Sequence, residues 1–280
     1  MNIESETIQA PRPSITDCPA IRIEGQSIPL RQTLVRLQVE DGGSFLRQAA
    51  EAALIRRGAR RLGLEVDADE AQTQADTFRR QRGLYSSQQL RDWLAQRHLT
   101  TDDWTGYLED LILRRRLMAR VAPDEEVKQH FLVNRPSFDL AEISHCVVDT
   151  DQIADEISLQ IREKKRDLHY FARRFSKDRQ TARLGGYLGW VRRPQINDAE
   201  LESRIFGSRC GETLAPFHCQ DGWRIVLVED LRLGELDHRL ETEIRESLFK
   251  DWLGREMEAC EISFPIFDSK ESPEGVNENK

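Results

Sequence analysis

The sequence lacks the features that would mark a membrane or exported protein. No apolar run approaches the roughly 18 residues that a membrane span needs, so we expect no membrane insertion. The first residues, Met1 to Glu6, carry neither a basic region nor an apolar core. A signal peptide is therefore not predicted, and we expect a cytoplasmic location.

Metal-binding and nucleic-acid-binding patterns are also missing. The five cysteines are scattered without CxxC spacing, so we expect reduced thiols. The histidines show no ligand spacing with cysteines or acids, and we predict no metal site and no cofactor. The formal net charge of −8 disfavours nucleic acid as a partner, because phosphate contacts need a basic face.

What is present fits a helix-rich protein of two domains. The 280 residues are 39% hydrophobic and 32% charged, which is enough for a sizeable core. Residues 1–20 are polar and proline-containing and are predicted to be disordered, whereas residues 21–30 alternate like a strand or hairpin. Residues 261–280 are predicted to form a flexible tail.

Helical patterns fill the region up to residue 136. Capping boxes at Asp67/Glu70 and Ser86/Gln89 begin two of the helices. We predict a helical, chaperone-like domain over residues 21–136, completed by a final helix at 237–260 that returns to pack on it. The predicted helices are 31–40, 44–63, 67–82, 86–98, one that opens at Thr101 and one that begins at Pro123.

After Pro136 the pattern changes to short strands and helices. Strands are predicted at 138–148 and near 187–191, 213–217 and 223–231, with helices at 151–163 and 167–175. This mixture predicts an α+β unit over residues 137–233, and the whole chain is assigned to the α+β class.

One motif set in this unit is specific. Ser144-His145 lies on the first predicted strand, Phe175-Ser176-Lys177-Asp178 follows the second helix, and Gly185-Gly186-Tyr187-Leu188-Gly189-Trp190 comes next. Together they resemble the parvulin-type peptidyl-prolyl cis-trans isomerases. With the helical domain, residues 45–255 resemble the SurA and PrsA type of foldase. The resemblance implies a small antiparallel sheet flanked by helices.

The resemblance also implies site residues. His145 and Asp178 would be catalytic, and the remaining positions would contact substrate. Departures from the family pattern are Ile196 for a methionine, Leu201 for a phenylalanine, Cys219 for a threonine and Arg224 for the second histidine. The implied substrate-binding residues are Leu188, Ile196, Leu201, Phe206, Cys219 and Arg224.

Structural alternatives stay open for these positions. His145 could be a core histidine and Asp178 a turn or cap residue, while Arg224 could pair with an acidic neighbour or bind an acidic residue before proline. Arginines at 56–61 and 114–116 are interpreted as solvated helix faces or as a cradle for an acidic client. An apolar groove is expected near Trp93 and Trp104.

Two functions follow as hypotheses. One is a prolyl isomerase acting on X-Pro bonds of unfolded or precursor polypeptides, with chaperone-like client binding. The alternative is a weakly active or inactive parvulin-fold adaptor that binds peptides for folding or export, suggested by Arg224. The sequence leaves the client and the oligomeric state open.

Overall fold

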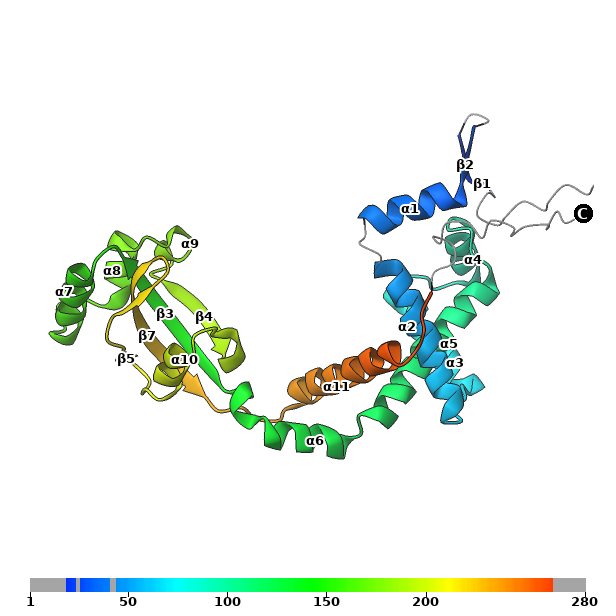
Figure 1. Cartoon of the computed structure of the whole chain (residues 1–280). Coiled ribbons are helices and arrows are strands. Elements are labelled where there is room, and N and C mark those ends of the chain that lie inside the picture. The colour runs from blue at the N-terminus through cyan, green and yellow to red at the C-terminus, as the bar shows by residue number, and fades with distance from the viewer. Residues whose placement is uncertain (1–18, 24–25, 41–43, 264–280) are drawn as a thin grey trace, which may run out of the picture. The chain divides into compact units, whose positions relative to one another are not determined.

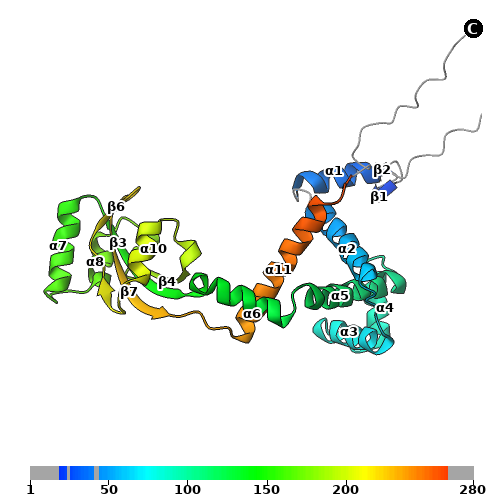
Figure 2. The ribbon, with the colours of Figure 1, turned by 60° about the horizontal axis from the view of Figure 1, so that its bottom comes forward.

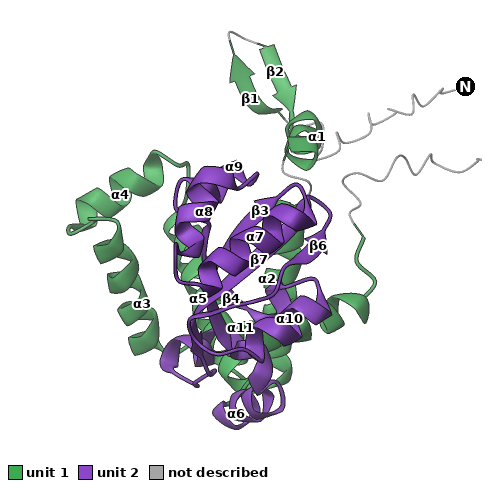
Figure 3. Ribbon diagram, turned by 90° about the vertical axis from the view of Figure 1, so that its left-hand side faces the viewer, with its two compact units in different colours: residues 1–123, 246–280 green, residues 124–245 purple. Residues whose placement is uncertain are grey.

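The computed structural model describes residues 19–23, 26–40 and 44–263. The chain divides into two compact units, residues 1–123 with 246–280 and residues 124–245 (Figure 3). The sequence places the boundaries instead at 136/137 and after 233, so residues 124–136 and 234–245 are grouped with the sheet. The expected disordered N-terminus and flexible tail fall almost wholly outside the described residues.

The first unit is helical and opens with an antiparallel hairpin of β1 (Pro19–Ile23) and β2 (Gln26–Pro29) (Figure 1). Ser86 and Gln89 cap α4 reciprocally, as predicted. Thr100 caps α5 together with Asp103, one residue before the predicted start. The helices are α1 (Leu30–Glu40), α2 (Ser44–Arg61), α3 (Ala68–Gln81), α4 (Ser87–Ala95), α5 (Thr101–Val121) and the second half of α11 (His238–Glu258).

Two apolar clusters hold these helices together. In the first cluster, residues of α2 and α5 pack against Phe249 and Leu253 of α11. The final helix therefore returns to the N-terminal helices, as the sequence predicts. The second cluster joins α3, α4 and α5 through Phe78, Leu84, Leu94, Trp104 and Leu108.

Arginines of α2 and α5 form ion pairs between helices. Arg56 binds both carboxylate oxygens of Asp110, at 2.6 and 2.9 Å. Similar pairs join α2 to α11, α5 to α11 and α5 to α3: Arg61–Glu256, Arg114–Glu246 and Arg115–Glu70. These pairs join the helices to one another, while the arginine side chains keep large exposed fractions. The interpretation as a cradle for an acidic client stays a prediction.

The second unit is built on an antiparallel sheet in the order β4-β3-β7-β5, with β6 also paired to β7. The mixed architecture confirms the α+β class. Its elements are α6 (Asp124–Val133), η2 (Arg135–Phe138), β3 (Leu140–Val148), α7 (Asp151–Arg162), α8 (Leu168–Phe175), α9 (Arg179–Ala182), β4 (Tyr187–Arg192), η3 (Arg193–Gln195), α10 (Ala199–Phe206), β5 (Glu212–Thr213), β6 (Phe217–Cys219) and β7 (Gly222–Arg232).

Each face of this sheet has its own apolar layer, because alternate strand residues point to opposite sides. Helices α7 and α8 cover the face of Cys146 and Ile225. Helix α10 covers the other face, where Ile205 packs over Ile143 and Val226 (Figure 2). His145 pairs with Val226 across β3 and β7, which places it on the α10 face.

Several elements of the second unit differ from the sequence predictions. Helices α9 and α10 were not among them, and the strand expected from residue 138 begins at Leu140 after a 3₁₀ turn. The strand expected at 213–217 is divided into β5 and β6. Pro216 explains the division, since proline has no N–H for a strand ladder.

The turn before β4 gives a first testable prediction. A Cβ on Gly186, whose φ is +81°, would lie 1.9 Å from the backbone oxygen of His145. Gly186→Ala must therefore shift the turn or β3, and we expect a loss of about 3 kcal/mol of folding free energy. Thermal unfolding followed by circular dichroism measures this loss.

Gly189→Ala is the matched control. Gly189 has a φ of +82°, but its nearest neighbouring atom would be 3.8 Å from the new Cβ. The Gly189→Ala variant should lose only about 1 kcal/mol of folding free energy, which is the cost of a left-handed backbone conformation for alanine. Equal losses from the two variants would contradict the close approach at Gly186.

Candidate functional site

His145 is the buried corner of a triangle of hydrogen bonds with half-buried Asp178 and Thr181. Its Nε2 atom is 2.8 Å from Asp178 Oδ2 and 2.9 Å from Thr181 Oγ1. Thr181 donates its hydroxyl to the same carboxylate oxygen at 2.6 Å. The histidine is 4% exposed, so these two partners fix its ring.

The Phe-Ser-Lys-Asp segment brings the carboxylate to this place by attaching to the end of β3. Val147 donates its N–H to Ser176 Oγ at 3.2 Å, and Lys177 donates its N–H to the Val147 oxygen at 2.8 Å. Asp178 Oδ1 then accepts the N–H of Gln180 at 3.0 Å and caps α9. Asp178 is thus both a cap residue and the partner of His145, one oxygen serving each role.

The hydrogen bonds determine the protonation of the pair. Bonds from Thr181, His145 and the Gln180 amide hold the pKa of Asp178 down to about 2. Burial lowers the pKa of His145, and the positive charge of Arg224 lowers it further. The hydrogen bond to Asp178 raises this pKa, but the net shift is downward.

The tautomer of His145 follows from its neighbours. A carboxylate only accepts, and the Thr181 hydroxyl proton is already donated, so Nε2 must carry the ring proton. The Nδ1 atom is buried without a hydrogen-bond partner among the described residues. A second proton there would have no acceptor, which agrees with the lowered pKa. His145 is therefore a neutral imidazole beside an ionised carboxylate.

A cavity of about 540 Å³ opens beside this triangle. It unites His145 with four predicted substrate-binding residues: Leu188, Ile196, Leu201 and Arg224. Leu188 is 42% exposed, so one wall faces solvent. The remaining lining is apolar where it comes from β3, β4, α10 and β7 and polar where it comes from η3 and the loops. Its residues are Ile143, Val191, Ile205 and Val226, and Gln195, Asn197, Asp198 and Gln220. The substrate-binding and catalytic roles of these residues stay predictions.

Two predicted substrate-binding residues, and the predicted catalytic residue Asp178, do not line this cavity. Phe206 packs in the apolar layer of α10, and the Arg193 guanidinium carbon lies 4.2 Å from its ring centroid. Cys219 donates its thiol to Asp221 Oδ1 at 2.9 Å and to the Gly222 oxygen at 3.0 Å. Burial raises the pKa of the Cys219 thiol. A substrate contact for either residue stays a prediction.

Arg224 lines the cavity and is paired on one side. Its Nη2 lies 3.3 and 3.2 Å from the two carboxylate oxygens of Asp221, so the expected pairing with an acidic neighbour is present. The buried Nε atom has no partner within the described part of the chain. Arg224 stands two residues before Val226, the partner of His145, so both side chains share one face of the sheet.

A second polar group supports β3 from the opposite face. Ser144 donates its hydroxyl to Glu229 at 2.7 Å, and His169 Nε2 lies 3.2 Å from the same carboxylate oxygen. His169 Nδ1 is 3.0 Å from the Gly185 oxygen. This group therefore ties α8 and the glycine turn to the two central strands.

Thr181, Glu229 and His169 are not among the site residues that the sequence predicts. For Thr181 a local signal exists: it follows Asp178 at a spacing of three, within the turn that Asp178 caps. Glu229 and His169 reach the site through strand pairing and helix packing, which no local pattern reports.

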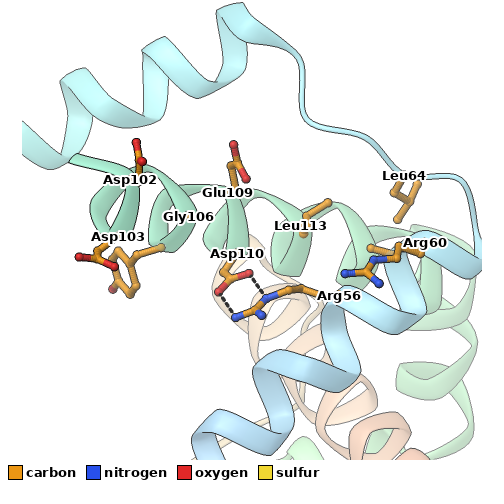
Figure 4. Close-up of a pocket in the computed structure, with 11 residues that line it drawn as sticks. Arg56, Arg60, Leu64, Asp102, Asp103, Gly106, Glu109, Asp110 and Leu113 are labelled. Atoms are coloured by element: carbon orange, nitrogen blue, oxygen red, sulfur yellow. Dashed lines mark hydrogen bonds and ion pairs between the residues drawn. The ribbon is translucent and has the colours of Figure 1, made fainter. Parts of the chain in front are cut away.

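The first unit carries cavities of its own along α5. One of about 580 Å³ lies between α2 and α5, where the Arg56–Asp110 pair forms part of the wall (Figure 4). Another, of about 380 Å³, is lined by Ala71 and Ala75 of α3 together with Trp104 and Leu108 of α5. Trp104 lines this cavity although it is itself buried, and Trp93 is not among the lining residues, so the expected apolar groove stays a prediction.

The described residues offer no metal centre and no membrane span. None of their His, Cys, Asp and Glu side chains gather in threes in a way that could bind a metal ion. In the same part of the chain, no helix has both the length and the apolar character to cross a bilayer.

Comparison with known proteins gives the class. The family model described as "Rotamase: PPIC-type PPIASE domain" matches residues 130–230, which include the whole triangle and the cavity. The chain thus carries a parvulin-type peptidyl-prolyl isomerase domain.

The similarity to known proteins extends beyond that domain, to the foldases PrsA and SurA. "Foldase protein PrsA" of Halalkalibacterium halodurans is 24% identical over 238 residues, 82% of this chain and 70% of that protein. "Chaperone SurA" of Alcanivorax borkumensis is 30% identical over 117 residues, 42% of this chain and 24% of that protein. The crystal structure of PrsA from Bacillus cereus aligns at 14% identity over 89% of this chain and 94% of that one, with a TM-score of 0.45.

The protonation of His145 is a testable prediction. Because its pKa is lowered, His145 should remain neutral and protonated at Nε2 at pH 6.5, where an ordinary histidine is about half charged. Long-range ¹⁵N–¹H NMR spectra of the imidazoles distinguish these states. The unfolded chain binds the proton more readily, so this histidine should make stability fall as the pH drops below about 6.5.

Arg224→Gln is the informative comparison, because it removes the arginine charge, which together with burial lowers the pKa of His145. His145 should then titrate at higher pH than in the parent. A parent histidine that titrates at or above 6.5, or that carries its proton on Nδ1, would contradict the assigned hydrogen bonds.

Proposed function

We propose that this chain is a foldase that isomerises X-Pro bonds in unfolded or precursor polypeptides and holds those polypeptides while it does so. The observation that carries the isomerase proposal is the open apolar cavity beside neutral His145 and ionised Asp178. The PPIC-type domain and the homology to PrsA and SurA support the same class.

Isomerisation of an X-Pro bond requires few functional groups in the site. Rotation about a peptide bond is opposed by its partial double-bond character, with a barrier of about 18–20 kcal/mol. No bond to the substrate need break, so a catalyst only has to favour the twisted amide over the planar one. Leu188, Ile196 and Leu201 offer apolar surface for the proline ring. The twisted amide, which has lost resonance, then lies next to the polar triangle.

The triangle acts through position and charge. Nε2 of His145 already donates to Asp178 and Thr181, so this atom is not free to protonate substrate. The buried Nδ1 carries a lone pair that accepts no hydrogen bond from any described residue. We therefore assign the pair His145 and Asp178 the role of fixing the polar wall against which the amide rotates.

Client holding is the second part of the proposal. The cavity at Trp104 is lined by alanines and leucines together with Gln72, Arg79, Thr105 and Glu109, and it lies outside the isomerase domain. An apolar surface of this kind suits an unfolded segment. In the adaptor alternative the chain binds clients but isomerises them weakly or not at all. This alternative rests on Arg224 in place of the second histidine. The expected cytoplasmic location stays a prediction, which cell fractionation tests.

Filling the isomerase cavity should abolish turnover. Leu201→Trp places a bulky side chain among the lining residues, so we expect at least about a hundredfold loss of kcat/KM on X-Pro peptides because the proline ring is excluded. Leu132→Trp is the control, since Leu132 of α6 is 65% exposed and far from the lining set in sequence. Turnover that survives in Leu201→Trp would place the reaction elsewhere.

A charge in the Trp104 cavity should weaken client holding without affecting turnover on short peptides. Ala71→Glu puts a carboxylate into the apolar lining, and the expected result is reduced suppression of aggregation of a chemically unfolded model protein. Thr73→Glu adds the same charge on the exposed side of α3 and serves as control. Equal holding by the two variants would argue against this cavity as the client surface.

A further inference from the structure

We infer that the isomerase cavity selects substrates in which glutamate or aspartate directly precedes the proline, and that Arg224 binds this acidic side chain. The inference rests on the proposed isomerase function and adds a substrate class to it. It requires a cation at the cavity, a free donor on that cation, and a position next to the rotating bond.

The charge requirement is met by Arg224. Among the described residues that line the cavity it is the only cation, since His145 is neutral. The lining also contains one carboxylate, Asp198. Its Oδ1 accepts the N–H groups of Glu200 and Leu201, at 2.9 and 3.0 Å, at the start of α10. Those amides and the helix dipole offset its charge, so the arginine dominates for an incoming anion.

Arg224 keeps donors to spare. A guanidinium has five N–H donors in a fixed fork, yet Asp221 is its one hydrogen-bond partner in the described part of the chain and engages Nη2 alone. The Asp221 side chain is 56% exposed, and the Arg224 side chain is 26% exposed. A solvent-exposed pair of this kind is weak, so a substrate carboxylate can bind Nη1 beside it or replace it.

The position fits the residue before proline. The cavity has an apolar side, Leu188, Ile196 and Leu201, that suits the ring. Its polar side includes His145 and Arg224, which share one face of the sheet. The carbonyl of the preceding residue belongs to the rotating bond, and neighbouring Cα atoms are about 3.8 Å apart. With the ring on the apolar side, the preceding side chain therefore starts at the polar wall.

The test compares kcat/KM for peptides that differ only before proline: Glu-Pro, its neutral isostere Gln-Pro, and Lys-Pro. The parent should prefer Glu-Pro over Gln-Pro by about tenfold, as expected for one charged hydrogen bond. That preference should shrink as salt is added. Arg224→Gln should bring the ratio near one, and Arg224→Glu should favour Lys-Pro. Asp221→Asn, which frees the guanidinium, should strengthen the preference for Glu-Pro.

Equal rates on Glu-Pro and Gln-Pro in the parent, or a preference that survives in Arg224→Gln, would overturn the inference and leave the isomerase proposal standing. A peptide with glutamate after the proline that is favoured as strongly as Glu-Pro would also overturn it. If no peptide is turned over, the isomerase proposal fails separately. NMR titration with the same Glu-Pro and Gln-Pro peptides then decides whether the cavity still binds the acidic one more tightly.

Discussion

The hydrogen bond between buried His145 and Asp178 is the constraint on which the isomerase unit depends. A buried imidazole left without partners would cost the fold free energy of desolvation, so the segment carrying Asp178 and Thr181 must be held against β3. Ser176 and Lys177 do this by bonding to Val147. On the other side, the Gly186 oxygen accepts the N–H of His145 at 2.8 Å. The backbone around the site is thereby fixed from two directions.

That rigidity explains how the cavity stays open. Its apolar side chains belong to strands, to α10 and, for Ile196, to the segment between η3 and α10, and they pack against Val226 and Ile143. Burial is the main cause that lowers the pKa of His145, and the positive charge of Arg224 lowers it further.

The helical unit is stabilised by a different set of interactions. Its helices meet through two apolar clusters, and arginines on α2 and α5 match carboxylates on neighbouring helices. The isomerase unit is inserted between residues 123 and 246 and has its own cores. Each unit thus buries its own apolar residues, which allows a client surface and a reaction site to be built separately.

Much of the site is encoded in local sequence motifs. The contacts between residues that are far apart in the chain can be seen only in the structure. Capping at Ser86 and the cluster of His145, Asp178 and Leu188 could be predicted, since short spacings or a family resemblance encode them. The Arg56–Asp110 pair could not, because its partners are far apart in the chain. Helix α10 is only eight residues long, too short for periodicity to identify, and its packing decides that Phe206 joins the core and Leu201 the cavity.

The central claim is that this cavity turns over X-Pro bonds, and exchange NMR tests it most directly. The full chain would be added in catalytic amount to a proline peptide whose cis and trans forms give separate resonances. The account predicts exchange cross-peaks between the two forms, together with shifts of the Leu188, Ile196 and Leu201 methyl groups when the peptide is in excess. Resonances that remain without exchange, while the methyl groups shift, would contradict catalysis and identify the cavity as a binding site only.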